Sequence, residues 1–305
     1  MARQRIRDAL AGGRILVSDG AWGSYLYAKG LATGSCPELW CVDHPGLVAD
    51  IAASYVAAGA DMIETNSFGG SSIRLAAQGL SSRVSELNGA AARISRAAAG
   101  EGVWVIASVG PTGAMLVTED CSEAELYDSF AEQALALAGG GADAFCVETM
   151  SDAAEAAIAI RAAKEATGLE VLATFTFSRT VQGQYRTMMG LSPEEAAAAA
   201  VAAGADVVGT NCGNGYAAMV DIAAAMRAAA PGVPIMVQAN AGLPLIVDGA
   251  LSYPEGPDYV ASLVPALLDA GVGIIGGCCG TTPAHIAAIR RAVDLYSAPR
   301  GPWRP

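Results

Sequence analysis

Three cysteines stand where their thiol groups could act on one substrate. Cys212 lies in residues 209–213, Gly-Thr-Asn-Cys-Gly, and Cys278 and Cys279 lie in residues 276–283, Gly-Gly-Cys-Cys-Gly-Thr-Thr-Pro. Each segment follows a short apolar run and precedes a helical pattern, so each is expected at the carboxyl end of a strand. Zinc held by three protein ligands keeps a fourth position open. The pattern therefore indicates a zinc site that accepts an incoming thiol.

Zinc in such a site changes the chemistry of the thiol that it binds. A free thiol has a pKa of about 8.5 and is mostly protonated at neutral pH, whereas a metal-bound thiol is deprotonated. Three thiolate ligands make the site electron-rich, so the incoming sulfur keeps its nucleophilicity. We therefore expect attack of that sulfur on an activated methyl group. A disulfide between the adjacent Cys278 and Cys279 would be strained and is not expected in a reducing compartment.

Two acidic residues form a second group of interest. Asp19 and Glu148 are expected at the ends of the first and fourth strands, where their carboxylates would bind the ammonium group of an amino acid. The backbone amides of Gly20 and Ala21 would then bind its carboxylate. Asp19 before a glycine is also an ordinary turn former, so the sequence leaves both interpretations open.

Further polar residues are expected at the same end of the strands. Asn66 and Ser108 lie in Gly-rich segments typical of substrate loops, and we include both among the substrate-binding residues. Asn240 ends the seventh expected strand, beside the thiols. Its side-chain oxygen would fill the fourth zinc position until the substrate displaces it, although turn chemistry explains Asn-Ala-Gly equally well.

The remaining cysteines and the two histidines are assigned no chemistry. Four cysteines are expected to be small buried apolar side chains: Cys36, Cys41, Cys121 and Cys146. Two histidines lie at helix starts and are expected to be surface or capping residues: His44 and His285.

A repeated unit defines the elements that must position these residues. In four copies, at residues 58–66, 140–149, 203–211 and 270–277, an Ala-rich helix stops at glycine and a short apolar strand follows. Four further strands are expected at residues 15–19, 103–109, 171–176 and 234–238. Helical patterns fall at residues 45–58, 82–98, 123–139, 152–166, 193–204, 216–229, 257–270 and 283–296.

Eight strands that alternate with eight helices predict a single-domain α/β fold, a (β/α)8 TIM barrel over residues 1–296, followed by a loose C-terminal tail at 297–305. An open doubly wound sheet is the alternative. The barrel is favoured because no Gly-x-Gly-x-x-Gly motif follows the first strand. In such a barrel the chemistry gathers at the carboxyl ends of the strands, where all of the candidate residues are expected.

The composition excludes several classes of function. A net charge of -12 without a basic patch argues against a nucleic-acid partner. No apolar run approaches the roughly 20 residues that span a bilayer, and the amino terminus lacks a hydrophobic signal core. We therefore expect a cytoplasmic protein with no membrane partner and with reduced thiols.

Seven segments in order resemble the zinc-dependent homocysteine S-methyltransferases, most closely the homocysteine-binding module of cobalamin-dependent methionine synthase. The segments are residues 19–23, 64–69, 110–113, 148–152, 211–212, 240–244 and 276–283. The resemblance implies a barrel in which Cys212, Cys278 and Cys279 ligate Zn²⁺, while Asp19 and Glu148 hold the amino end of homocysteine. Methionine would be the product, which implies a place in methionine biosynthesis. Betaine-dependent relatives carry a tyrosine near the position of Phe68, and the phenylalanine here offers no such oxygen ligand.

The resemblance leaves the substrates partly open. Methionine synthase carries folate, cobalamin and reactivation modules after this one, and this chain is expected to be the barrel alone. The methyl donor would then be S-methylmethionine, S-adenosylmethionine or a separate methyl-corrinoid protein. Residues 182–190 and 213–216 depart from the family pattern, so a thiol other than homocysteine is an open alternative.

Two rival interpretations remain at this point. The chain would be a homocysteine-binding or corrinoid-docking subunit without turnover of its own, or a barrel aldolase or epimerase with Glu148 as its base. Activity that survives chelation would favour the aldolase or epimerase.

Overall fold

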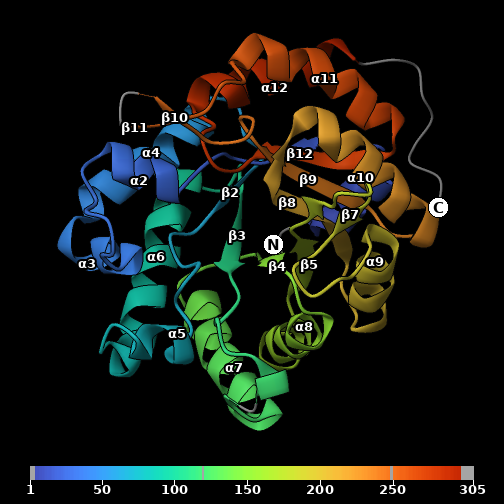
Figure 1. Cartoon of the computed structure of the whole chain (residues 1–305). Helices are drawn as coiled ribbons and strands as arrows, with labels where there is room; N and C mark the ends of the chain where they lie inside the picture. The colour runs from blue at the N-terminus through green and yellow to red at the C-terminus, as the bar shows by residue number, and fades with distance from the viewer. Residues whose placement is uncertain (1–3, 119, 248–249, 297–305) are drawn as a thin grey trace.

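The computed structural model describes residues 4–118, 120–247 and 250–296. Eight parallel strands form one sheet surrounded by helices, which is the predicted single-domain (β/α)8 barrel (Figure 1). The tail predicted at 297–305 lies outside the described residues. The eight strands are β1 (Leu16–Val17), β2 (Met62–Glu64), β3 (Trp104–Val109), β4 (Ala144–Met150), β5 (Glu170–Phe175), β8 (Val207–Gly215), β9 (Ile235–Asn240) and β12 (Val272–Gly277).

The strand order distinguishes the barrel from an open sheet. The strands follow one another as β1-β12-β9-β8-β5-β4-β3-β2, and the first strand pairs with the last, with Leu16 opposite Ile274. A doubly wound sheet would place the first strand in its interior. The alternative fold is therefore excluded.

The two ends of this order, β1 and β2, meet through Asp61. The Asp61 backbone N–H donates to the Val17 carbonyl at 2.7 Å, and the Asp61 carboxylate accepts from the Val17 N–H at 2.9 Å. The same carboxylate forms ion pairs with Arg14 at 3.1 Å and with Arg290 at 2.9 Å. One partly buried acid thus joins the first strand, the second strand and the last helix.

The eight outer helices lie within a few residues of their predicted positions. They are α4 (Pro45–Ala57), α6 (Val84–Ala99), α7 (Glu123–Gly139), α8 (Ala153–Thr167), α9 (Pro193–Ala202), α10 (Tyr216–Ala229), α11 (Pro257–Asp269) and α12 (Pro283–Leu295). Ser122 and Ser192 begin α7 and α9 with capping boxes, in which the serine hydroxyl and a glutamate three residues later satisfy free N–H groups. Gly168 ends α8 in the left-handed conformation.

Several short elements were absent from the sequence-based prediction. They are the helices α1 (Ile6–Ala11), α2 (Gly23–Ala28), α3 (Trp40–Asp43) and α5 (Ser72–Ala76), the 3-10 turns at Pro37–Leu39, Ser81–Arg83 and Leu116–Thr118, and the hairpins β6 (Ser178–Arg179) with β7 (Tyr185–Arg186) and β10 (Leu245–Val247) with β11 (Ala250–Ser252). Both hairpins belong to loops that follow barrel strands. They therefore add to the carboxyl-end face.

Helix α1 closes the opposite end of the barrel. The N–H groups of Ile6 and Arg7 donate to the Glu170 carboxylate at 2.7 and 3.1 Å, so an acid at the start of β5 binds the first turn of the helix. Ile6 and Leu10 pack into the apolar barrel interior. This end of the barrel is therefore filled by apolar side chains. Within the described residues, no helix combines the length and apolar character needed to cross a bilayer.

The role of Asp61 in closure gives a stability prediction. Replacing Asp61 with Ala removes its ion pairs and the acceptor of the Val17 N–H, so we expect about 2 kcal/mol of lost stability. That loss corresponds to a thermal midpoint lower by about 3 °C in a chain of this length, measured by circular dichroism. Asp294→Ala is the matched control, because Asp294 pairs with the same Arg290 at 2.7 Å but is 63% exposed. An equal effect of the two substitutions would contradict the role of Asp61.

Candidate metal and thiol-binding site

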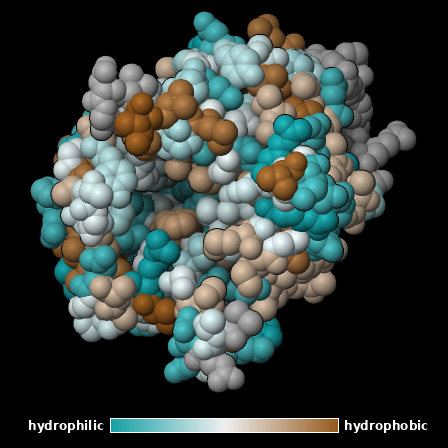
Figure 2. All heavy atoms as spheres, viewed as in Figure 1, coloured by the Kyte–Doolittle hydropathy of each residue, from teal (hydrophilic) through white to brown (hydrophobic). Residues whose placement is uncertain are grey.

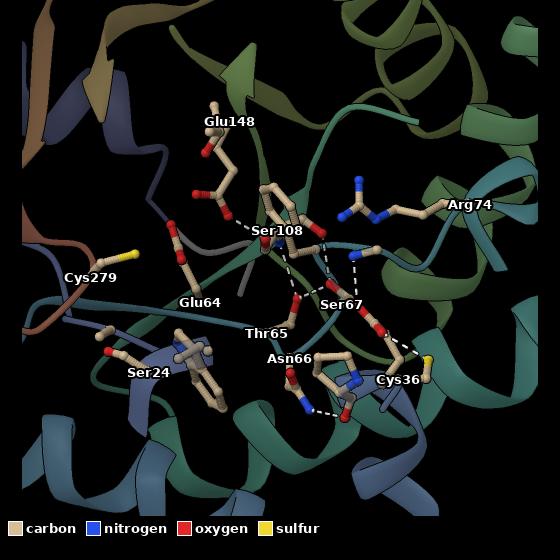
Figure 3. Close-up of a pocket in the computed structure, with 18 of the residues that line it drawn as sticks. Ser24, Cys36, Glu64, Thr65, Asn66, Ser67, Arg74, Ser108, Glu148 and Cys279 are labelled. Carbon is tan, nitrogen blue, oxygen red and sulfur yellow. Dashed lines mark hydrogen bonds between the residues drawn. The ribbon is translucent and has the colours of Figure 1, made fainter. Parts of the chain in front are cut away.

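A cavity of about 640 Å³ opens at the carboxyl ends of the barrel strands. Figure 2 shows the hollow in this face, and Figure 3 shows side chains on its wall. The wall contains most of the residues predicted from the sequence: Gly20, Ala21, Asn66, Ser108, Glu148, Cys212, Cys278 and Cys279. The predicted site is thus one cavity built from segments far apart in the chain.

The three predicted thiols converge in this cavity. The sulfur atoms of Cys212, Cys278 and Cys279 all lie within 4.8 Å of one another, and the Cys212 and Cys279 sulfurs are 4.0 Å apart. Zinc–sulfur bonds of about 2.3 Å in a tetrahedron place sulfurs about 3.8 Å apart. Among the described residues, this is the one group of three potential ligands so arranged. All three thiols are free, so Cys278 and Cys279 form no disulfide.

The backbone is strained where it presents Cys212. This residue has φ 57°, and within the described residues only Thr149 shares a positive φ without being glycine. Asn211 joins the two, because its side-chain oxygen accepts from the Thr149 N–H at 2.8 Å. Its amide also donates to Glu148 at 3.0 Å. A left-handed conformation costs about 1–2 kcal/mol for a residue with a side chain, and such strain concentrates at functional sites.

Two glycines beside the thiols are required by close packing. At Gly213, with φ 69°, a Cβ atom would lie 2.7 Å from the Thr176 hydroxyl and 2.8 Å from the Phe177 carbonyl oxygen. At Gly280, with φ 79°, a Cβ atom would collide with the Tyr253 ring. Both positions therefore need glycine for space and for conformation.

The thiols affect one another's protonation. The pKa of Cys212 is lowered to about 3, because the Cys278 and Cys279 thiols hydrogen-bond to its sulfur. The pKa of Cys278 is raised well above its usual value and that of Cys279 is raised to about 11, since each provides a hydrogen bond to Cys212 and faces its charge. One thiolate is stable only while its neighbours keep their protons. Three thiolates together need a cation, so the set fits a soft divalent metal.

Asn240 has an oxygen atom without a partner beside the sulfurs. The residue is 4% exposed, and its Oδ1 atom is buried and accepts no hydrogen bond. Its side-chain amide contributes to the lowered pKa of Cys212, which places it against that thiol. A buried acceptor without a donor is costly in an apolar interior. The assignment of Asn240 as the fourth ligand stays a prediction.

Glu148 lies on the cavity wall in a network of hydrogen bonds. Its carboxylate accepts from the Ser108 hydroxyl and from the Asn211 amide. The Ser108 hydroxyl is thus used to orient the carboxylate. This geometry alone shows no substrate contact for Ser108. Burial raises the pKa of Glu148 to about 7, and the Ser108 hydrogen bond opposes that rise. Glu148 is therefore a buried acid close to its protonation midpoint at neutral pH.

Asp19 occupies a different place from Glu148. Its side chain is fully buried, and one carboxylate oxygen accepts from the Trp22 indole at 2.9 Å and from the Glu64 N–H at 2.7 Å. Burial raises its pKa to about 7. The neighbouring Gly20 and Ala21 line the cavity, but Asp19 does not. The structure thus places this acid behind the wall, where it holds Trp22 and the end of β2.

Two predicted contact residues also have structural partners. The Asn66 amide donates to the Pro37 carbonyl at 2.7 Å and to the Cys41 sulfur at 3.5 Å. The Ala21 N–H donates to the Thr281 hydroxyl at 3.1 Å. Both residues face the cavity, but these bonds already use the Asn66 amide and the Ala21 N–H.

Glu64 is a cavity residue that the list of predicted site residues omitted. It is 6% exposed, lies on the wall, and accepts from the Gln238 amide at 2.8 Å. The available signal was a glutamate at the end of a buried strand, since such residues rarely lack a partner. Figure 3 shows the Glu64 and Glu148 carboxylates directed toward one another, with the Cys279 sulfur on the same side of the cavity.

The residues without an assigned role differ partly from expectation. Cys36, Cys41 and Cys146 are buried as predicted, whereas Cys121 is half-exposed because it precedes α7 in a surface loop. His44 is exposed at the start of α4, as predicted.

His285 was predicted to be a surface or a capping residue. The surface position is wrong, and the capping role is confirmed. Its Nδ1 atom bonds Thr282 at the start of α12, and its Nε2 atom lies 2.9 Å from the Glu255 carbonyl oxygen. The ring is 7% exposed because the second contact draws it under the loop that carries Glu255.

The fold and the site together define the class of the protein: a parallel (β/α)8 barrel with three thiols and a buried acid at the carboxyl ends of its strands. The family model described as homocysteine S-methyltransferase matches residues 16–293. The chain therefore belongs to the homocysteine S-methyltransferase family.

Known relatives agree with this assignment. The chain is 32% identical to the methionine synthases of Mycobacterium tuberculosis and Mycobacterium leprae, over 94% of its own length and 25% of theirs. It thus spans about a quarter of these curated relatives. Among solved structures it is similar to the metallated form of the homocysteine methyltransferase MmuM from Escherichia coli, with 25% identity, a TM-score of 0.75, and coverage of 94% of this chain and 99% of that chain.

The raised pKa of Glu148 predicts a pH-dependent stability. The folded pKa of about 7 lies above the unfolded value near 4.5, so the stabilising contribution is complete below pH about 4.5 and disappears as the pH rises through 7. In protein free of metal and substrate, Glu148→Gln should therefore flatten the fall of the thermal midpoint between pH 5 and 8. Glu132→Gln removes an exposed charge as the control. If the thermal midpoints of the wild-type protein and of Glu148→Gln fall in parallel as the pH rises, the raised pKa of Glu148 is contradicted.

Proposed function

We propose that this protein is a zinc-dependent S-methyltransferase that methylates homocysteine to give methionine. The observation that carries the proposal is the convergence of Cys212, Cys278 and Cys279 within 4.8 Å on the wall of a cavity that also contains a buried acid, Glu148. Family membership supports the reaction class. The thiol set supports the metal.

The protein would hold zinc through the three cysteine sulfurs. The partnerless Oδ1 atom of Asn240 supports this residue as the ligand that occupies the fourth position in the absence of substrate. When bound, zinc supplies the charge that keeps a substrate thiol deprotonated at neutral pH. Asn240 would hold the metal only while no acceptor thiol is bound, and the three cysteines would hold it throughout.

The chain's own residues would orient the amino acid. Glu148 offers a carboxylate to its ammonium group, and Ser108 and Asn211 hold that carboxylate in place. Gly20 lies beside the thiols on the same wall and offers its backbone amide to the substrate carboxylate. Asp19 acts from behind the wall by fixing Trp22. With both ends held, the sulfur faces the open cavity, from which a methyl donor approaches in line.

The remaining volume of the cavity would receive the methyl donor. A small sulfonium donor would enter the cavity itself, whereas a methyl-corrinoid protein would dock over its mouth. Assays with homocysteine and S-methylmethionine, S-adenosylmethionine or free methylcobalamin distinguish these donors. A chain that is inert with every small donor would instead be a subunit that serves a separate methyl-carrying protein. Because the site needs three reduced thiols, we propose that the protein is located in the cytoplasm.

Zinc content tests the proposed metal site. Purified protein should contain about one zinc per chain, and Cys278→Ala should lose nearly all of it together with methyl transfer, because two thiolates bind zinc much more weakly than three. Elemental analysis and a homocysteine methylation assay measure the two effects. Cys121→Ala is the control, since this half-exposed thiol lies in a different loop. Methyl transfer by metal-free protein would refute the proposal.

The role of Asn240 predicts a separate effect. Asn240→Ala should keep the three sulfur ligands but release zinc to a chelator about tenfold faster, because the resting site loses its fourth protein ligand. The release is followed by the absorbance of a zinc-binding dye. Saturating homocysteine should remove the difference, since its sulfur then occupies that position. An unchanged release rate would exclude Asn240 as a ligand.

A further inference from the structure

The wall of the cavity contains a cationic side chain that the proposed mechanism does not use. Arg74 is the one lysine or arginine among the described residues that line the cavity. Resting on the proposed function, we propose that its guanidinium group binds a carboxylate of the methyl donor. The donor would then be a small zwitterion, with an onium cation at the end that carries the methyl group and a carboxylate at the other end.

The side chain of Arg74 is held at three points. Its Nη1 atom donates to the Pro111 carbonyl at 3.0 Å. The guanidinium group lies over the Phe68 ring, 5.4 Å from the ring centre. The side chain also passes close to the Gly69 backbone, where an added Cβ atom would lie 3.0 Å from Nε. The guanidinium group is thus in place before a ligand arrives, which reduces the entropy lost on binding.

The loop that carries Phe68 is fixed as well. The Phe68 carbonyl accepts from the Gly110 N–H at 2.9 Å, and a Cβ atom at Gly110 would collide with the Phe68 ring. The next residue, Gly69, donates its N–H to the Glu38 carboxylate at 2.6 Å. Glu38 is only 4% exposed. The aromatic ring beneath the guanidinium group therefore rests on a loop that is bonded to its surroundings on both sides.

Within the described residues, no acid forms an ion pair with Arg74. Two acids near it have other partners. Glu38 also accepts from the Cys36 thiol at 3.1 Å, and Glu155 accepts from the N–H and the hydroxyl of Thr112 at 2.8 and 2.7 Å. A guanidinium group has five N–H donors, and a single backbone carbonyl uses one of them here. The remaining donors can bind both oxygens of a ligand carboxylate.

The direction of methyl transfer places the rest of the donor on this side of the cavity. In-line transfer requires the acceptor sulfur to approach the methyl carbon from the side opposite the leaving group. Figure 3 shows Arg74 across the cavity from the Cys279 sulfur, with the Glu64 and Glu148 carboxylates between them. The leaving part of the donor therefore extends away from the thiols and toward Arg74.

The charges along the cavity complement an onium carboxylate. The acids between the two ends favour a positive group, and Arg74 favours a negative one. During transfer the methyl carbon bonds to the acceptor sulfur while its bond to the onium atom of the donor breaks. The electron pair of that bond stays on the donor, which loses its positive charge. The carboxylate does not change in this step, so Arg74 would hold the donor throughout.

Donor binding tests the assignment without requiring turnover. Isothermal calorimetry in the absence of acceptor should compare S-methylmethionine with its carboxamide, in which a neutral amide replaces the carboxylate. The wild-type protein should bind S-methylmethionine at least about tenfold more tightly, because the carboxamide loses the charge-assisted pair. Arg74→Gln should reduce this preference to less than about threefold. A general loosening of the cavity would weaken both ligands equally and leave the ratio unchanged.

A matched variant controls for the loss of a positive charge. Arg83 pairs with Glu86 at 2.6 Å and does not line the cavity, so Arg83→Gln should keep the wild-type preference. A kinetic measurement at saturating homocysteine gives a second readout. Arg74→Gln should raise the KM for S-methylmethionine about tenfold and change kcat much less, because the guanidinium group binds a part of the donor that does not react.

The outcomes separate this inference from the proposed function. An unchanged preference in Arg74→Gln, an equal loss in Arg83→Gln, or no preference in the wild-type protein would overturn the donor site. A preference that is lost in Arg74→Gln and kept in Arg83→Gln would support it. Absence of methyl transfer with every donor would count against the proposed reaction, but it leaves the comparison of the two ligands intact.

Discussion

The repulsion that three closely spaced sulfurs would exert once all are deprotonated is the constraint on which the site depends. Cys212 comes from the end of β8, and Cys278 and Cys279 follow β12, so the barrel must close before the sulfurs can meet. The left-handed backbone at Cys212 and the glycines at 213 and 280 bring the thiols together at a conformational cost. A metal that binds all three would offset that cost and the repulsion.

The charges in the cavity are organised around the same constraint. The three thiols and the acids Glu64 and Glu148 are all negative when ionised. The lining of the cavity offers few cationic side chains to balance them. Two cationic ligands would complete the site: a metal at the sulfurs and an ammonium group at the acids. An amino acid that carries a thiol would bind to both parts of the site with one molecule, because its sulfur would bind the metal and its nitrogen would bind the acids.

The fold and the thiols could be predicted from the sequence because their signals are local. The Ala-rich helix, the glycine that ends it and the apolar strand repeat along the chain, and each copy predicts one βα unit. The cysteines were recognisable by their position after such strands. The position of Asp19 behind the cavity wall and the contact between Glu64 and Gln238 were not recognisable. They depend on which side chains face the cavity, and this is set by strand register and by the contact between β1 and β2. The hairpins β6–β7 and β10–β11 are too short to leave a periodic pattern.

X-ray absorption at the zinc edge tests the central claim most directly. The purified protein should show three sulfur neighbours at about 2.3 Å and one nitrogen or oxygen neighbour at about 2.0–2.2 Å. Addition of homocysteine should convert this to four sulfur neighbours. A spectrum with fewer than three sulfurs, or one that does not change when homocysteine is added, would contradict the account.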